Sequence, residues 1–111
     1  TSIGTLDSRT SNISDYVIQS QMPTAENNYT WYRKYKSGWV EQGGYTSMTD
    51  AVITINLPVT MSDTNYTLLL FQEKNTDGQN VPGITAKTTT SFSINASSNA
   101  NGGWQVSGIA L

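Results

Sequence analysis

The sequence predicts an all-β fold, a small antiparallel sandwich or barrel. Short runs of alternating apolar and polar residues follow one another from residue 29 to the C-terminus, and turn-forming residues separate them. No segment after residue 28 shows the 3.6-residue period of an amphipathic helix. A length of 111 residues allows one domain, and a hydrophobic content of 36% allows only a thin core.

The first 22 residues differ from the rest and predict the end of a stalk that continues from a longer protein. Apolar residues and one threonine follow spacings of three and four, as in a coiled-coil seam: Ile3, Leu6, Thr10, Ile13 and Val17. From Tyr16 to Met22 the pattern becomes β-like. Residues 1–22 are therefore expected to form a short coiled coil or an extended segment, with a disordered tail as the alternative. Pro23 and the polar residues after it predict a linker over residues 23–28.

Residues 29–44 read YTWYRKYKSGWVEQGG and predict a β-hairpin. The run Tyr29–Lys36 alternates, Ser37-Gly38 supplies a tight turn, and Trp39–Tyr45 returns. At least two of the rings are expected to serve as cross-strand pairs and core, the hairpin is mainly structural, and only its turn is a candidate contact surface. The pair Gly43-Gly44 permits a bulge or a close backbone approach.

Three further strands are predicted to complete the fold together with a polar loop at Ser97–Gly103. These strands are Ala51–Thr60, with Pro58 placing its end at an edge or a bulge, Ile84–Ala96, and Trp104–Leu111.

One more strand, Tyr66–Glu73, is apolar on both faces. Leu69 and Phe71 lie opposite the face that carries Leu68 and Leu70. A strand that faces water on its outer side should be polar there, so a second subunit is expected to cover Leu69 and Phe71.

Composition excludes several kinds of function. A formal net charge of −2 and a pI near 4.7 argue against a nucleic-acid binder, which needs a basic surface. The chain has no cysteine and no histidine, which rules out disulfides, thiolate zinc sites and nucleophiles activated by histidine. The acids Glu41, Asp50, Asp63 and Glu73 show no spacing that recommends a carboxylate pair for catalysis. We therefore expect no catalytic residues, no cofactor and no metal site.

The hairpin resembles the hallmark of C-terminal tip domains in tail-fibre proteins of tailed bacteriophages and prophages. That hallmark reads W-Y-R-x-Y-x-x-G-W-x-E-Q-G-G, and its positions here are Trp31, Tyr32, Arg33, Tyr35, Gly38, Trp39, Glu41, Gln42, Gly43 and Gly44. Two weaker features also fit, namely the D-T-N-Y run at residues 63–66 and the closing Gly103-Trp104 strand. The resemblance covers residues 29–111 and implies a trimeric β-sandwich knob, similar in architecture to H-type lectins.

The resemblance implies a receptor-binding tip at the distal end of a virion's tail fibre. Such a tip would be a homotrimer that attaches to a bacterial surface polysaccharide or an outer-membrane protein. A structural domain that trimerises and caps the fibre without touching a receptor is the alternative. A depolymerase is a third possibility, disfavoured by the short chain and by the absence of histidine and cysteine.

Strands that simply alternate up and down the fibre would place three loops at the end away from the stalk. Those loops are Lys36–Trp39, Met61–Asn65 and Ser97–Gly103, whereas Thr46–Asp50 and Lys74–Gly83 would face the stalk. The predicted receptor-binding residues are an aromatic platform, a cation and four amide or carboxylate groups: Trp39, Lys36, Asp63, Asn65, Asn99 and Asn101. One additional crossing would reverse the later loops.

Overall fold

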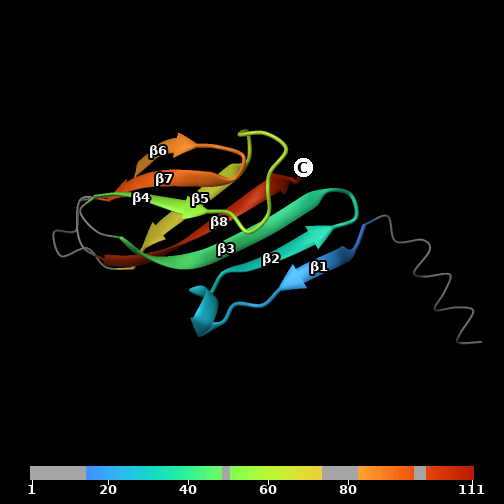
Figure 1. Cartoon of the computed structure of the whole chain (residues 1–111), viewed down its shortest axis with the longest axis horizontal. Coiled ribbons are helices and arrows are strands. Elements are labelled where there is room, and N and C mark those ends of the chain that lie inside the picture. Colours follow the sequence, from blue (N-terminus) through green and yellow to red (C-terminus); the bar gives the residue numbers. More distant parts are fainter. Residues whose placement is uncertain (1–14, 49–50, 74–82, 97–99) are drawn as a thin grey trace, which may run out of the picture.

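The computed structural model describes residues 15–48, 51–73, 83–96 and 100–111, and these form two antiparallel sheets without an α-helix. The larger sheet has five strands in the spatial order β1 (Val17–Gln21), β2 (Trp31–Tyr35), β3 (Trp39–Met48), β8 (Ala100–Ile109) and β5 (Thr67–Gln72). The smaller sheet has three strands in the order β4 (Ala51–Asn56), β7 (Ser91–Ala96) and β6 (Gly83–Lys87) (Figure 1). The predicted all-β, sandwich-like fold is thus confirmed.

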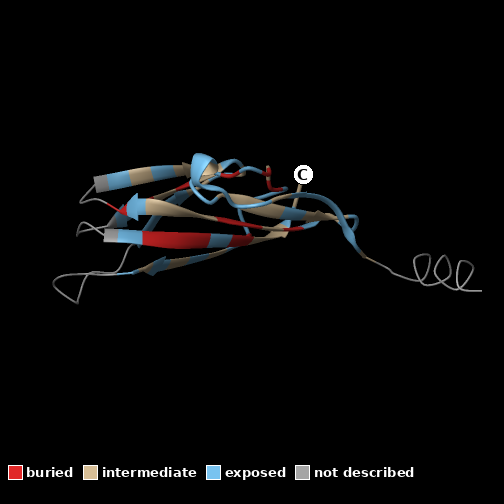
Figure 2. Ribbon diagram, turned by 90° about the horizontal axis from the view of Figure 1, so that it is seen from below, coloured by how far each residue is buried: buried red, intermediate tan, exposed pale blue. Residues whose placement is uncertain are grey.

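The core lies between the two sheets. Alternate residues of each strand point inward because the side-chain period of a strand is two. Val40 and Val106 of the larger sheet and Ile94 of the smaller one are fully buried, and the rings of Phe92 and Trp104 meet edge to face across the core at 5.4 Å. Buried residues (red in Figure 2) lie within the strands and are interrupted by intermediate and exposed ones.

The predicted hairpin is present and its turn lies where the sequence put it. Gly38 has a positive φ of 98°, which a residue with a side chain adopts only with strain. β2 and β3 pair in unbroken register, from Trp31 opposite Gly43 to Lys34 opposite Val40. The prediction of a bulge at Gly43-Gly44 is therefore wrong, whereas the alternative prediction, a close approach of other atoms to the backbone there, is right.

The two glycines each accommodate an indole ring, one on each face of the sheet. A Cβ atom at Gly43 would lie 2.8 Å from Nε1 of Trp31, and one at Gly44 would lie 2.8 Å from Nε1 of Trp104. Trp31 lies on the outer face and Trp104 lies in the core. A ring that lies flat on a glycine shields the backbone of that strand from water.

The predicted strand Ile84–Ala96 is instead a hairpin of two strands, β6 and β7. Its turn is formed by the hydroxyl of Thr88, which accepts hydrogen bonds from the backbone N–H groups of Thr90 and Ser91 at 3.2 and 3.0 Å. Serine and threonine hydroxyls form such turns, yet threonine also favours strands, so the sequence pattern pointed to one continuous strand.

The predicted loop Ser97–Gly103 is also partly strand, because β8 begins at Ala100. Gly102 and Gly103 belong to this strand rather than to a turn. Met48 and Phe71 pack against them so closely that a Cβ atom at Gly103 would lie 2.3 Å from the ring of Phe71.

Residues 17–21, which the sequence assigned to the stalk, form the edge strand β1 and pair with β2. These residues thus belong to the larger sheet. A short 3-10 helix, Ala25–Asn27, lies within the predicted linker. The seam residues Ile3, Leu6, Thr10 and Ile13 lie outside the described residues, so the division into stalk, linker and tip domain stays a prediction.

The chain enters the described fold at the end that carries the β2–β3 turn. The backbone N–H and the hydroxyl of Ser37 donate to the carboxylate of Asp15 at 3.0 and 2.6 Å. The prediction that Lys36–Trp39 lies away from the N-terminal segment is therefore wrong. The reason is β1, an additional strand that reverses the chain once before β2 begins.

The β6–β7 hairpin adds a second reversal of the chain direction that the sequence pattern did not predict, and the loops after it therefore lie at the other end of the sandwich from the predicted one. β8 consequently runs opposite to the predicted direction, with Ile109 paired to Trp39 and Ala100 paired to Met48. The segments that border residues 49–50, 74–82 and 97–99 all reach the end of the sandwich opposite Asp15. The expected grouping of the loop Ser97–Gly103 with Trp39 is thus wrong.

Candidate functional site

A hollow of about 390 Å³ lies where β3 begins, β8 ends and β5 begins. The connection between β4 and β5 closes its remaining side. Its lining residues are Trp39, Ser62, Asp63, Asn65, Tyr66, Thr67, Ser107, Gly108 and Ile109. We refer to this cavity as the Trp39 hollow.

The wall formed by the β4–β5 connection is fixed by a buried glutamine on β3. Gln42 is fully buried, and its side-chain amide pairs with the backbone of Val59 as a neighbouring strand would. Its Nε2 donates to the carbonyl of Val59 at 3.1 Å, and its Oε1 accepts from the N–H of Val59 at 3.0 Å. Because a buried amide must find partners, this pair ties the connection to the larger sheet.

The other end of this wall is held by the smaller sheet through Tyr66. Lys87 donates to the backbone carbonyl of Tyr66 at 2.7 Å, and its ammonium lies 4.3 Å from the centre of the Tyr66 ring. The hydroxyl of Tyr66 lies within hydrogen-bond distance of the carbonyl oxygens of Thr88 and Ser91. Burial raises the pKa of Tyr66, which keeps the hydroxyl protonated as a donor.

Between the buried Met61 and the buried Tyr66, all four residues of the loop 62–65 are exposed. Asp63 accepts the N–H of Asn65 at 2.8 Å, which shapes the loop as a tight turn. The hollow thus combines an indole that is 39% exposed with hydroxyl, carboxylate and amide groups. Pockets with an apolar or aromatic wall and a few polar groups are typical ligand sites.

The structure brings together three of the six predicted site residues, Trp39, Asp63 and Asn65. Lys36 is close by but outside the lining, and its ammonium lies 5.5 Å from the centre of the Tyr16 ring. Asn101 pairs with Ser47 at the other end of the larger sheet, and Asn99 lies outside the described residues. Whether any of these residues binds a receptor stays a prediction.

The sequence pattern did not place Ser107 and Ile109 in this hollow. Both lie on β8, and the direction of β8 depends on the turn at Thr88 that the sequence pattern concealed. Their alternation with the buried Val106 was the available signal, since it placed them on the outer face.

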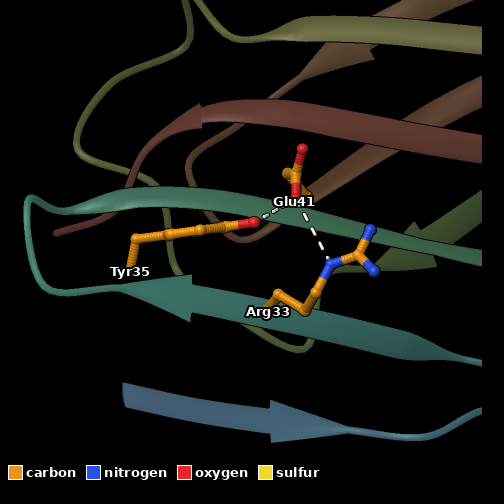
Figure 3. Close-up of polar contacts among 3 residues, drawn as sticks. All are labelled: Arg33, Tyr35 and Glu41. Atoms are coloured by element: carbon orange, nitrogen blue, oxygen red, sulfur yellow. Dashed lines mark hydrogen bonds and ion pairs between the residues drawn. The ribbon is translucent and has the colours of Figure 1, made fainter. Parts of the chain in front are cut away.

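Two polar clusters on the outer face of the larger sheet involve the acids considered as catalytic candidates. Glu41 accepts from Nε of Arg33 at 3.3 Å and from the hydroxyl of Tyr35 at 3.0 Å (Figure 3). The bond to Glu41 raises the pKa of Tyr35. At the opposite end of β3, Tyr45 donates to Glu73 at 2.8 Å, which raises the pKa of Tyr45 in the same way.

Each of these two carboxylates is thus engaged by a phenol. Asp63 lies in the exposed loop of the hollow, and Asp50 lies outside the described residues. Within the described part of the chain, no three residues among histidine, cysteine, aspartate and glutamate come close enough to hold a metal ion. In the same part of the chain, no helix has the length and apolar character to cross a membrane.

Solved structures of tail fibres are similar to this fold. A C-terminal part of the R2 pyocin fibre of P. aeruginosa matches 97% of this chain with a TM-score of 0.64 and 17% identity. An N-truncated R2-type pyocin tail fibre gives a TM-score of 0.59 at 16% identity, and an N-truncated R1-type fibre gives 0.57 at 11%, each over 97% of this chain. No family model and no curated protein matches the sequence.

The chain therefore has the fold of C-terminal parts of R-type pyocin tail fibres, and the recognition of a fibre tip from the sequence is confirmed at the level of fold. It spans 29% and 43% of the two R2 chains and 96% of the R1 chain.

Proposed function

We propose that this chain is the receptor-binding tip domain of a phage or prophage tail fibre. In this proposal it acts by binding, without catalysis, cofactor or metal, at the distal end of the fibre in the virion. Support comes from the fold that it shares with pyocin tail fibres and from the hairpin motif at residues 31–44. The domain is proposed to be a homotrimeric, H-type-lectin-like knob.

The Trp39 hollow is the proposed contact site. The observation that carries this proposal is the convergence of Trp39 with Asp63 and Asn65, which come from separate segments, in one cavity. An exposed indole can stack on the C–H face of a sugar while the amide and carboxylate bind its hydroxyls. A bacterial surface polysaccharide is therefore the favoured receptor, and an outer-membrane protein is the alternative.

Cell binding by the purified chain tests the proposal. Trp39→Ala is expected to weaken binding at least about tenfold, which corresponds to about 1.4 kcal/mol. Tyr29→Ala is the matched control, since Tyr29 is likewise an exposed ring but pairs with Tyr45 near the opposite end of β3. Free polysaccharide from the bound strain should compete with the cells.

Three other outcomes are informative. Equal binding by Trp39→Ala and the unchanged chain would show that the hollow is not the contact site. Binding that polysaccharide does not reduce would favour a protein receptor. A folded chain that binds no strain in a broad panel would leave the structural role of trimerising and capping the fibre, which the exposed apolar residues Leu69 and Phe71 favour.

A further inference from the structure

The outer face of the larger sheet carries an apolar surface that the core does not use. Leu69 and Phe71 of β5 are 60% and 55% exposed, while their neighbours Leu68 and Leu70 pack against the core. We define the outer apolar face by the residues that project from the middle of this sheet: Trp31, Gly43, Leu69, Phe71, Gly103 and Gln105. A hollow of about 330 Å³ lies between Trp31 on one side and Leu69 with Phe71 on the other.

The glycines make this face flat. Trp31 covers Gly43, and Phe71 covers Gly103, at distances that leave no room for a Cβ atom. The two rings consequently lie along the sheet rather than standing away from it. A flat apolar sheet is the surface on which a second sheet packs, at about 10 Å.

The smaller sheet provides an internal comparison. Its outer face carries Val52 as its one large apolar side chain among the described residues, with Thr54 beside Ser93 at a hydroxyl distance of 2.9 Å. Asn56 and Asn95 complete that polar surface. The two outer faces of one sandwich therefore differ in character, as expected when water meets one of them and protein meets the other.

We infer that the outer apolar face is where copies of this chain contact one another. The inference rests on the proposed function, which expects a homotrimer, and adds the surface by which the copies meet. Among the residues that line the hollow, only Gln105 and the indole N–H groups of Trp31 and Trp104 are polar, so a sugar would leave most of its hydroxyls unpaired there. Arg33 and Glu41, at the margin of the face, neutralise each other and present no net charge to a partner of opposite sign.

The size of the face also fits a stable contact between subunits. Two strands of this sheet have ten residues and three have five or six, so at about 4.8 Å between strands and about 3.3 Å per residue the face has a projected area of roughly 570 Å². A stable interface buries about 600–1,000 Å² of accessible surface on each partner, so a contact through this face lies near the lower end of that range. The Trp39 hollow lies at the rim of this face, so that assembly leaves it beside the contact.

Paired substitutions test the inference, with Val52, which is 62% exposed, as the matched control. In light scattering at micromolar concentration, the unchanged chain and Val52→Glu should be oligomers, whereas Leu69→Glu should have the mass of a monomer. Because the chain has no cysteine, a single Leu69→Cys or Val52→Cys can be crosslinked between copies by a short bismaleimide. Crosslinking is expected for Leu69→Cys and not for Val52→Cys.

If Leu69→Glu fails to fold, crosslinking of the cysteine variants tests whether copies meet through the outer apolar face. A monomeric unchanged chain, an oligomer that persists in a folded Leu69→Glu, or crosslinking at Val52 equal to that at Leu69 would each overturn the inference. Failure here is distinct from failure of the receptor role. A chain that assembles through this face yet binds no cell refutes only the receptor role, and one that binds cells while Leu69→Glu leaves its mass unchanged refutes only the interface.

Discussion

Replacing Gln42 by leucine tests how the wall of the Trp39 hollow is held in place. Leucine nearly fills the volume of glutamine but can neither donate to the carbonyl of Val59 nor accept from its N–H. Val59 is itself buried, so both backbone groups would lose their partners away from water. An unsatisfied buried donor or acceptor costs about 1–3 kcal/mol, and the two groups together therefore predict a loss of about 2–6 kcal/mol of unfolding free energy.

The measurement is denaturant unfolding followed by tryptophan fluorescence, at one fixed protein concentration because assembly contributes to stability. Gln19→Leu is the matched control, since Gln19 is an exposed glutamine on the edge strand β1, and its effect should stay within about 0.5 kcal/mol. A loss below about 1 kcal/mol for Gln42→Leu would refute the reasoning, because it would mean that the β4–β5 connection is held mainly by apolar packing.

Two further predictions concern a glycine and a carboxylate. Gly103→Ala should destabilise the fold by about 1–3 kcal/mol, because its Cβ would meet the ring of Phe71, and adding Phe71→Ala should recover part of that loss in the same unfolding assay. The hydroxyl and N–H of Ser37 lower the pKa of Asp15, so this contact stabilises the fold above the usual aspartate pKa and is lost as the pH falls through the lowered value. Titration followed by NMR should show the pKa of Asp15 rising in Ser37→Ala, and an unchanged pKa would contradict the assignment.

Local patterns were sufficient where a glycine marks the turn. Ser37-Gly38 located the first hairpin correctly, whereas β4 ends at Asn56, so the proline at position 58 lies beyond the strand Ala51–Thr60 in which the sequence pattern had placed it. The turn at Thr88 has neither residue and depends on a hydroxyl that closes on its own backbone. Missing that one reversal placed Asn101 at the wrong end and left Ser107 and Ile109 out of the site.

The sequence pattern could not predict contacts between segments that lie far apart in the chain. Gln42 occupies an inward position of β3, where the alternation calls for an apolar residue. Its partner is the backbone of Val59 in the β4–β5 connection. Because residues of almost every type carry the same backbone groups, the residue type at position 59 does not reveal this contact. The grouping of Trp39 with Asp63 was nevertheless predictable, because both follow from counting strand directions up to β5.

The loop 62–65 is attached to a rigid frame at both of its ends, through the buried Met61 and Tyr66, and the N–H of Ser62 also donates to the carbonyl of Ile109 on β8 at 2.9 Å. Its four side chains can therefore be exchanged with little effect on the sandwich. Loops of this kind are natural targets for combinatorial libraries, and under the proposed receptor role, selection on a new bacterial strain would change the binding specificity through residues 62–65. The anchoring residues Gln42 and Lys87 would be kept constant in such a library.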